Sequence, residues 1–264
     1  MVRKLETVNI LNCNIAKIKM SEILAMVEDY IKVGKFHSGS GINADQLVKI
    51  NENHNFKGII QKSDILFADG MSVIFAANLL RTPLPERIGA TDVFENLLNL
   101  AVEKGYGVYF LGTTDKILSK AIEHYKSTYK GLKISGYHHG YWQAGDEDVI
   151  IEKINECSPD LLFLGISSPK KEEFIEKNKH KLKSVSFALG VGGAFDIHAG
   201  KYARAPVWMQ KLFLEWLFRL LQEPKRLFWR YSVNNTKFLY LLSKRLLSKN
   251  TTSIGKGILR KNTP

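Results

Sequence analysis

Residues 107–142, GVYFLGTTDKILSKAIEHYKSTYKGLKISGYHHGYW, hold a short apolar run, an amphipathic stretch and a second run in succession. Short continuous apolar runs are typical of strands that are buried on both faces of a sheet. The stretch between the two runs has the apolar periodicity of a surface helix. This segment therefore predicts a strand–helix–strand unit, in which a crossover helix joins two parallel strands.

The alternation of apolar runs and helical stretches continues on both sides of this unit. We expect a strand or hairpin at 7–18, helices at 19–35, 71–80, 91–105, 147–157 and 170–180, a strand end running into a helix at 41–53, and strands at 63–70, 160–166 and 185–193. Short continuous strands alternating with helices form a parallel sheet that is covered on both faces. The predicted fold class is α/β, with a Rossmann-like, mostly parallel sheet and helices on both of its faces.

The composition is that of a cytoplasmic globular protein. With 45% hydrophobic and 24% charged residues, the chain can bury a sizeable core. Two cysteines, Cys13 and Cys157, are too few for a disulfide framework and fit a reducing compartment. No run approaches the ~18 apolar residues of a membrane-spanning helix, and the N-terminus lacks the apolar segment of a signal peptide. We therefore expect a cytoplasmic protein.

The excess positive charge is confined to the C-terminal quarter of the chain. Residues 201–264 hold fourteen Lys and Arg against two Asp and Glu, so they carry the whole formal net charge of +12. Three of the four tryptophans also lie there. We expect an α/β core at 1–200, a basic, aromatic helical appendage at 201–248 and a disordered tail at 249–264. The charge indicates an anionic partner: a membrane surface, a nucleic acid or a phosphorylated substrate.

Polar residues directly follow several of the predicted strands. They are Asn43, Asp69, Thr113, Lys171 in the turn SSPKKE, and Asp196. In open parallel sheets, ligands bind beyond the carboxyl ends of the strands. We therefore expect these side chains to converge on one cleft.

The glycine-rich stretch GVGGAF, 190–195, is not a dinucleotide fingerprint. Its sixth position is Phe195, and it follows the last predicted strand instead of the first. The sequence also has no P-loop and no His/Cys cluster with metal-ligand spacing. We expect a cleft that binds a phosphate-bearing ligand through carboxylates, amides and arginines, with neither a metal nor a cofactor.

Several longer motifs together resemble one protein family. They are FADGMSV, PERIGATDVF, YFLGTT, DLLFLGISSPKKEEF, VGGAFDIHAGKYARAPVW and LEWLFRLLQEPKRLFWRY. In this order, from about Thr7 to Tyr231, the chain resembles the WecG/TagA/CpsF glycosyltransferase family. The resemblance implies inverting transfer of a hexose or N-acetylhexosamine from a UDP-sugar to a polyprenyl-diphosphate-linked sugar, in cell-wall or surface polysaccharide assembly. It also implies a protein held peripherally on the inner face of the cell membrane.

The resemblance implies roles for two residues near the ends of the early strands. Asp69 matches the family's proposed base, which takes the proton of the acceptor hydroxyl. The alternative is that Asp69 caps the following helix. Arg87 matches a position near the substrate phosphates; the alternative is an ion pair with Glu86 or Asp92.

The resemblance also implies that arginines of the appendage close over the active site. Arg219, Arg226 and Arg230 are expected to stabilise the charge on the leaving diphosphate. Pro224 is expected to break the helix between the first two of them.

The remaining site residues lie at the same predicted edge of the sheet. Gly192 lets the backbone approach the nucleotide, and Asp196 is expected to hydrogen-bond uridine, ribose or sugar. Asn43 and Thr113 are further substrate contacts. For Arg204 we favour an anchor between core and appendage over a phosphate ligand.

Three positions, at two sites in the sequence, depart from the family's usual pattern. Gly41 stands where a threonine is common, so a hydroxyl is absent. Lys171 replaces a glutamine, and Ser167 a glycine, in the common GxPKQE turn. A sugar that carries a carboxylate, such as a uronic acid, would pair with Lys171. A phosphate contact or subfamily drift explains the lysine as well, and we favour that interpretation.

The aromatic and basic residues of 206–247 have helical spacing. Such amphipathic helices suit the surface of an anionic bilayer, where a polyprenyl acceptor lies. A nucleic-acid-binding module is the alternative from a different class, with cations on phosphates and aromatic rings stacked on bases. The continuous apolar face argues against nucleic acid, and a dimerisation or core-packing helix pair explains part of it. The oligomeric state stays open, and a homo-oligomer is compatible with the sequence.

Overall fold

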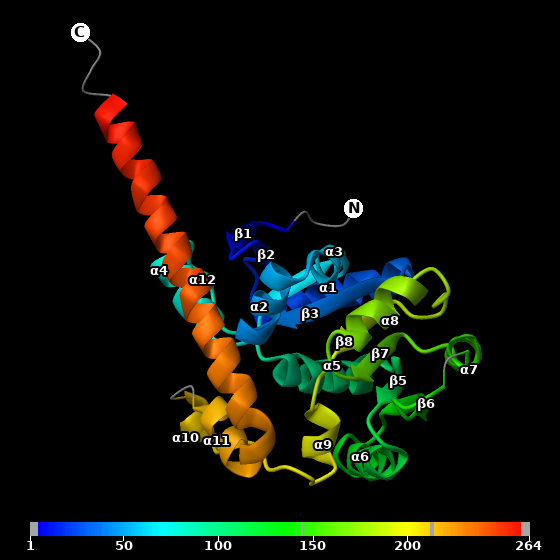
Figure 1. Cartoon of the computed structure of the whole chain (residues 1–264). Coiled ribbons are helices and arrows are strands. Elements are labelled where there is room, and N and C mark those ends of the chain that lie inside the picture. Colours follow the sequence, from blue (N-terminus) through cyan, green and yellow to red (C-terminus); the bar gives the residue numbers. More distant parts are fainter. Residues whose placement is uncertain (1–4, 144, 212–213, 260–264) are drawn as a thin grey trace.

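The computed structural model describes residues 5–143, 145–211 and 214–259, and for residues 210, 211 and 249–259 it describes the backbone only. Six parallel strands form one sheet in the order β4-β3-β8-β7-β5-β6 (Figure 1). They are β3 (His37–Ile42), β4 (Ile65–Ala68), β5 (Gly107–Gly112), β6 (Lys133–His138), β7 (Leu161–Gly165) and β8 (Phe187–Gly190). The predicted α/β class with a parallel, Rossmann-like sheet is confirmed.

The helices of the core cover both faces of this sheet. They are α1 (Met20–Val33), α2 (Ala44–Glu52), α3 (His54–Ile60), α4 (Met71–Leu79), α5 (Ala90–Lys104), α6 (Asp115–Thr128), α7 (Glu147–Cys157) and α8 (Lys170–Asn178). Successive side chains of a strand point to opposite faces. On one face, aromatic strand residues such as Phe110 and Phe163 pack with α1, α5 and α6 in a single core. On the other face the apolar core has two separate clusters, one around α2, α3 and α4 and one around α7 and α8.

The first residues form an antiparallel hairpin of β1 (Thr7–Ile10) and β2 (Cys13–Ala16). Leu11 and Asn12 connect the two strands with φ angles of 45° and 65°. Both residues therefore adopt the left-handed conformation that tight hairpin turns require. Of the two structures expected for this segment, the hairpin is the one observed.

Strand β3, with the sequence HSGSGI, is longer than the strand end that the sequence predicts. It lies between β4 and β8, where its neighbours leave little room for side chains. A Cβ atom at Gly39 would come within 2.7 Å of the Phe187 ring, and one at Gly41 within 2.6 Å of the Asp69 Cβ. Small residues therefore let this strand fit beneath the side chains of its neighbours.

The C-terminal segment contains α9 (Ala194–His198), α10 (Val207–Lys211), α11 (Glu215–Gln222) and α12 (Pro224–Leu259). The helix break predicted at Pro224 is confirmed, because α12 begins with this residue. Phe238 and Leu242 of α12 pack into the cluster around α2, and Lys237 pairs with Glu52 at 2.7 Å (Figure 1). The appendage is therefore anchored on the core by apolar contacts as well as by charge.

Helix α12 also continues where the sequence predicts a disordered tail. Its backbone is helical to Leu259, whereas residues 260–264 of that tail lie outside the described residues. Extending an existing helix adds one backbone hydrogen bond per residue without a new nucleation step, which composition alone does not reveal. None of the helices within the described ranges is both long and apolar enough to cross a membrane.

Candidate active site

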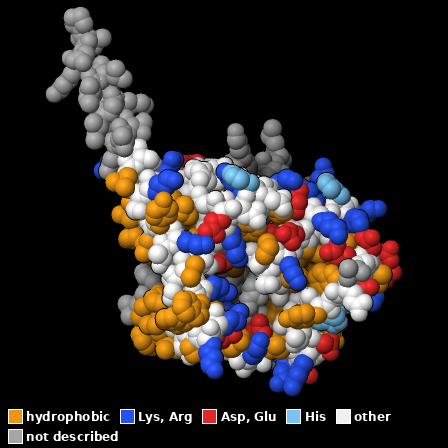
Figure 2. All heavy atoms as spheres, viewed as in Figure 1, with side chains coloured by type: hydrophobic (Ala, Val, Ile, Leu, Met, Phe, Trp, Pro, Cys, Tyr) orange, Lys and Arg blue, Asp and Glu red, His pale blue; other side chains and the backbone are white. Residues whose placement is uncertain are grey.

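A cleft with a volume of about 1190 Å³ opens at the carboxyl ends of β3, β4, β5, β7 and β8. Helices α11 and α12 form its opposite wall, and Lys and Arg side chains gather along the hollow (Figure 2). All ten residues that the sequence proposed for a site line it: Asn43, Asp69, Arg87, Thr113, Lys171, Gly192, Asp196, Arg219, Arg226 and Arg230. The structure thus brings the polar ends of the strands and the appendage arginines into one space.

Asp69 lies at the floor of the cleft, directly after β4. Its backbone N–H donates to the carbonyl of Ile42 at 2.8 Å, which extends the pairing of β3 with β4 by one residue. Its Oδ1 accepts a hydrogen bond from the N–H of Ala90 at 3.0 Å. Asp69 therefore does interact with a helix N-terminus, but the helix is α5 and not the following helix α4 that the capping alternative names. Among the described residues, no hydrogen-bond donor contacts its second carboxylate oxygen.

The environment of Asp69 favours its protonated form. Burial raises the pKa of this carboxyl to about 6, against the hydrogen bond from Ala90 and the positive charges of Arg87 and Lys171. The carboxylate of Glu215 adds to the rise. A carboxyl with a pKa near 6 is ionised at neutral pH and still basic enough to take a proton in a transition state.

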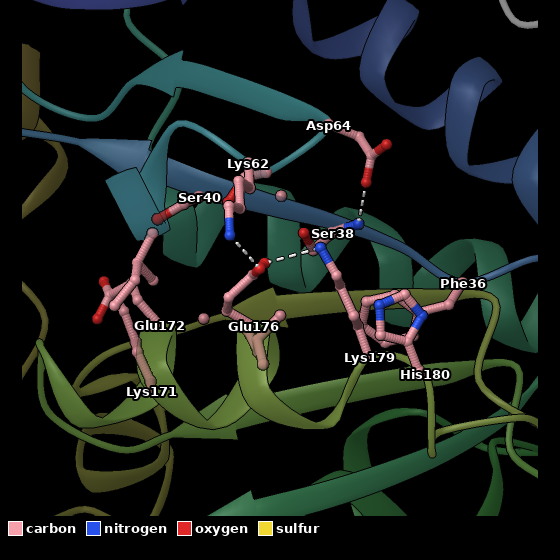
Figure 3. Close-up of a pocket in the computed structure, with 15 residues that line it drawn as sticks. Phe36, Ser38, Ser40, Lys62, Asp64, Lys171, Glu172, Glu176, Lys179 and His180 are labelled. Atoms are coloured by element: carbon pink, nitrogen blue, oxygen red, sulfur yellow. Dashed lines mark hydrogen bonds and ion pairs between the residues drawn. The ribbon is translucent and has the colours of Figure 1, made fainter. Parts of the chain in front are cut away.

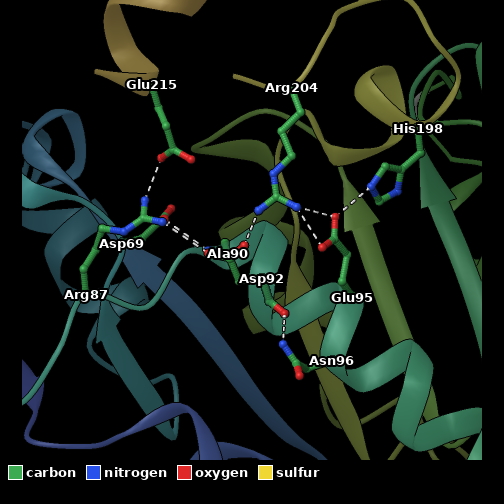
Figure 4. Close-up of polar contacts among 9 residues, drawn as sticks. All are labelled: Asp69, Arg87, Ala90, Asp92, Glu95, Asn96, His198, Arg204 and Glu215. Carbon is green, nitrogen blue, oxygen red and sulfur yellow. Dashed lines mark hydrogen bonds and ion pairs between the residues drawn. The ribbon is translucent and has the colours of Figure 1, made fainter. Parts of the chain in front are cut away.

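Arg87 is held between two carboxylates at the mouth of the cleft. Its Nη1 lies 2.6 Å from Glu215 Oε2, and its Nη2 lies 3.2 Å from Asp92 Oδ2 (Figure 4). Of the two ion-pair partners that the sequence offered for Arg87, Asp92 is observed, whereas Glu86 accepts from the N–H of Met20. Sequence reasoning missed Glu215 as a site residue. Its signal is that it is one of only two acidic residues among the basic residues of 201–264.

Arg204 connects the start of the appendage to α5. Its guanidinium contacts Asp92, and it reaches both carboxylate oxygens of Glu95 at 2.7 and 2.8 Å. Glu95 also contacts His198 of α9 at 3.1 Å (Figure 4). Arg204 therefore has the partners of the anchor that we favoured from the sequence.

The glycine-rich turn after β8 brings the backbone to the edge of the cleft. Gly192 has a φ of +55°, a conformation that favours glycine. A Cβ atom at Gly193 would lie 3.1 Å from Nη2 of Arg219, so this arginine of α11 rests directly on the turn. Asp196 begins the next helix turn and pairs with Lys201 at 3.0 Å.

The cleft contains cations without a carboxylate partner. Among the described residues, Lys170, Arg219 and Arg230 line the cleft and form no ion pair with Asp or Glu. Arg226, in contrast, pairs with Glu223 one turn away, and both residues line the cleft. The unpaired cations can accept an anionic ligand without first breaking an ion pair within the protein.

Asn43 and Thr113 have structural roles at the same edge. Asn43 is the N-cap of α2, and its side-chain oxygen accepts from the N–H of Gln46 at 3.2 Å. Thr113 has a φ of +48°, and its carbonyl accepts from the N–H of Gly140 at 2.7 Å. Both residues therefore shape the loops that border the cleft.

Lys171 lies in the inner wall of the cleft, beside Gly190. A Cβ atom at Gly190 would come within 2.8–3.1 Å of the end of the lysine side chain. Lys171 is 8% exposed, and its ammonium lies 3.5 Å from the carboxylate of Glu172. Its charge is therefore already balanced within the protein, so the lysine does not require a sugar that carries a carboxylate.

The single Asp-x-Asp pair of the sequence, Asp146 and Asp148, lies at the start of α7 and does not line the cleft. Asp148 pairs there with Lys181 at 2.5 Å. Within the described ranges, no three His, Cys, Asp or Glu side chains lie together in a metal-binding arrangement.

Comparison with known proteins gives consistent matches. The chain matches the model of the Glycosyl transferase WecG/TagA/CpsF family over residues 8–252. It is 33% identical over 188 residues to an N-acetylglucosaminyldiphosphoundecaprenol N-acetyl-beta-D-mannosaminyltransferase of Bacillus spizizenii, an alignment that covers 71% of each chain. A protein of the same description from Bacillus subtilis is 30% identical over 213 residues, or 80% of this chain and 81% of the relative. Another from Staphylococcus aureus is 32% identical over 169 residues, or 64% and 65% of the two chains.

Proposed function

Since the chain belongs to the glycosyl transferase WecG/TagA/CpsF family and is a glycosyltransferase, we propose that it moves a hexose or N-acetylhexosamine from a UDP-sugar to a polyprenyl-diphosphate-linked sugar. The names of its relatives make N-acetylmannosamine the first sugar to test, on a diphosphate-linked N-acetylglucosamine acceptor. One observation carries the proposal: a half-buried carboxylate, Asp69, lies in the same cleft as the unpaired cations Lys170, Arg219 and Arg230.

Asp69 acts as the general base in this proposal. Its carboxylate takes the proton of the acceptor hydroxyl while the hydroxyl oxygen attacks the anomeric carbon. The bond from that carbon to the UDP oxygen breaks on the opposite face, so the anomeric configuration inverts. The attacking oxygen becomes the new glycosidic oxygen, and UDP leaves with the bonding electron pair. No metal ion takes part in these steps.

The cations of the cleft stabilise the negative charge that develops on the leaving diphosphate. Arg219 is placed for this role by its contact with the turn at Gly193, where a nucleotide can approach the backbone. Arg230 and Lys170 add charge at the same rim, and Asp196 hydrogen-bonds the nucleoside or sugar. Arg87 and Arg226 join the phosphate contacts when a diphosphate replaces their carboxylate partners, Glu215 and Glu223.

The appendage docks on an anionic membrane surface, where the lipid-linked acceptor is found. Large apolar side chains of α10, α11 and α12 are exposed, among them Val207, Trp208, Trp216, Leu221, Phe228, Trp229, Val233, Leu239 and Tyr240. Figure 2 shows hydrophobic side chains gathered over these helices beside Lys and Arg. An exposed apolar patch flanked by cations suits the boundary between headgroups and acyl chains. We therefore place the protein on the inner face of the cell membrane as a peripheral protein.

A panel of UDP-sugars tests the proposal with a polyprenyl-diphosphate N-acetylglucosamine acceptor. UDP-N-acetylmannosamine is expected to turn over, and NMR of the product should show the anomeric configuration opposite to that of the donor. Arg219→Ala should lower turnover by a factor of about 10²–10³, as the loss of one charge-stabilising donor does. Arg245→Ala, an exposed arginine of α12 outside the cleft, is the matched control and should turn over normally.

Two results would contradict the proposal. If UDP-glucuronic acid were the only donor that turned over, the transferred sugar would be a uronic acid, and Lys171 would be the residue that pairs with its carboxylate. Retention of the anomeric configuration would exclude Asp69 as a base in a single displacement.

A further inference from the structure

A second cavity, of about 370 Å³, lies between α3 and α8 on the sheet face that carries the divided apolar core (Figure 3). Ser38 and Ser40 of β3 form its floor, and side chains of α8 form one wall. It shares Lys171 and Gly190 with the active-site cleft, so the two spaces lie on either side of one wall. A polar hollow thus occupies the place where the two apolar clusters would otherwise meet.

The charges around this cavity balance one another. Glu176 pairs with Lys62 at 2.7 Å and with Lys179 at 2.9 Å. Asp64 accepts from the N–H of Ser38 at 2.8 Å and contacts His37 at 3.0 Å. Lys171 and Glu172 balance each other at 3.5 Å. The three lysines of the cavity (Lys62, Lys171 and Lys179) and its three carboxylates (Asp64, Glu172 and Glu176) sum to zero formal charge. An ion that entered the cavity would therefore meet no net opposite charge and would lose its hydration.

Hydrogen-bonding capacity in the cavity is left unused. Within the described part of the chain, both carboxylate oxygens of Glu172 are buried without a hydrogen-bond partner, although the Lys171 ammonium lies 3.5 Å away, and the Glu172 side chain is only 4% exposed. The hydroxyl of Ser40 is buried without a partner as well. In Figure 3, Ser40, Lys171 and Glu172 lie together at one end of the cavity. Buried polar atoms are normally paired, so this end needs a molecule that donates hydrogen bonds.

The cavity also has an apolar side. Phe36, Ile59 and Ile175 line it, and a hydrocarbon face can pack against them. The Lys62 side chain at the rim is 57% exposed, which gives access from solvent. The volume falls in the range of small-ligand pockets.

We propose that this cavity is a second binding site, for a neutral, hydroxyl-rich molecule of the size of a monosaccharide. Hydroxyl groups of the ligand donate to Glu172, one accepts from or donates to Ser40, and the C–H face packs on Ile59 and Ile175. The site is separate from the donor and acceptor positions and does not depend on the function proposed above.

Free N-acetylglucosamine and free glucose are the probes for this site, and the full chain is kept saturated with UDP so that the cleft is occupied. Binding is followed by NMR of the backbone amides of Ser40 and Glu172. The expected dissociation constant is on the order of millimolar for so small a ligand. Glu172→Gln and Ser40→Ala should each weaken binding by about tenfold, because each removes a partner of the ligand's hydroxyls. Glu173→Gln, an exposed carboxylate next along the same helix, should bind as the unchanged protein does.

The measurement on the unchanged protein holds even if the Glu172 variant fails to fold. Two results would overturn the proposal: no shift of these amides at about 100 mM sugar, or equal affinity in the Ser40 variant. A crystal soaked in sugar that showed only ordered water on Glu172 and Ser40 would overturn it too.

Discussion

Replacing Asp69 by asparagine should make the protein more stable and nearly inactive at the same time. The substitution keeps the shape of the side chain, and its oxygen can still accept from the N–H of Ala90. It removes the ionisable carboxyl, which is the group proposed to take the acceptor proton. A residue with a purely structural role would not change stability and turnover in opposite directions.

The sign and size of the stability change follow from the pKa. Burial raises the pKa of Asp69 from 3.8 to about 6, so the folded protein binds this proton more tightly than the unfolded chain does. Above pH 6 the ionised carboxylate therefore destabilises the fold, whereas below pH 3.8 both states are protonated and the effect vanishes. At about 1.4 kcal/mol per pKa unit the full rise corresponds to about 3 kcal/mol. Because Asp69 borders a solvent-filled cleft, we expect about 1–2 kcal/mol.

Thermal unfolding of both proteins at pH 8 and pH 4 measures this effect. Asp69→Asn should raise Tm by roughly 2–8 °C at pH 8 and by much less at pH 4, where the folded carboxyl is protonated. Turnover at pH 8 should fall by a factor of about 10²–10⁴, with UDP binding retained. Asp148→Asn, an exposed aspartate of α7, is the matched control and should keep full turnover. Near-normal turnover of the Asp69 variant would remove Asp69 from the mechanism, and a lower Tm at pH 8 would refute the burial argument.

Three further predictions concern the metal, the charge beside Asp69 and the membrane surface. Turnover should persist in excess chelator, and complete loss that magnesium or manganese restores would contradict the metal-independent mechanism. Glu215→Gln removes a negative charge that raises the Asp69 pKa, so the pH below which kcat/KM falls should move from about 6 to a lower value. An unchanged value would show that Glu215 does not affect the ionisation of Asp69. Replacing exposed Leu221 and Trp229 by serine should weaken binding to anionic vesicles by about tenfold or more, while Tyr141→Ser on the core should not; tighter, salt-sensitive binding of DNA or RNA would instead support the nucleic-acid alternative.

The sequence was sufficient to predict the class of the fold and the edge of the sheet that carries the cleft. The apolar runs at β5 and β8 are buried along their whole length and that of β7 up to Leu164, as continuous runs predict. The polar residues after the strands, such as Asp69 and Asp196, line one cleft because parallel strands end at a common edge. Both features follow from local periodicity, which can be recognised in each segment of the sequence by itself.

Contacts between distant segments could not be predicted in the same way. In the sequence HSGSGI of β3, only the last residue, Ile42, is typical of strands. The segment fits as an interior strand because its glycines leave space for the side chains of Phe187 and Asp69. Glu215 lies 128 residues from Arg87, and no local pattern relates them. The cavity beside Glu172 likewise exists only where two helices pack on a strand of small residues.

Periodicity and motifs therefore determined which elements form, in which order, and which polar side chains line the cleft. The tertiary structure alone decided the ionisation of Asp69, the partners of Arg87, Arg204 and Arg226, and the contact of Arg219 with the turn at Gly193. The physical reason is the difference in the distance over which these effects act. Hydrophobic periodicity acts over a few residues of one segment, whereas burial and ion pairing depend on distances that are fixed only when α5, α11 and the sheet come together.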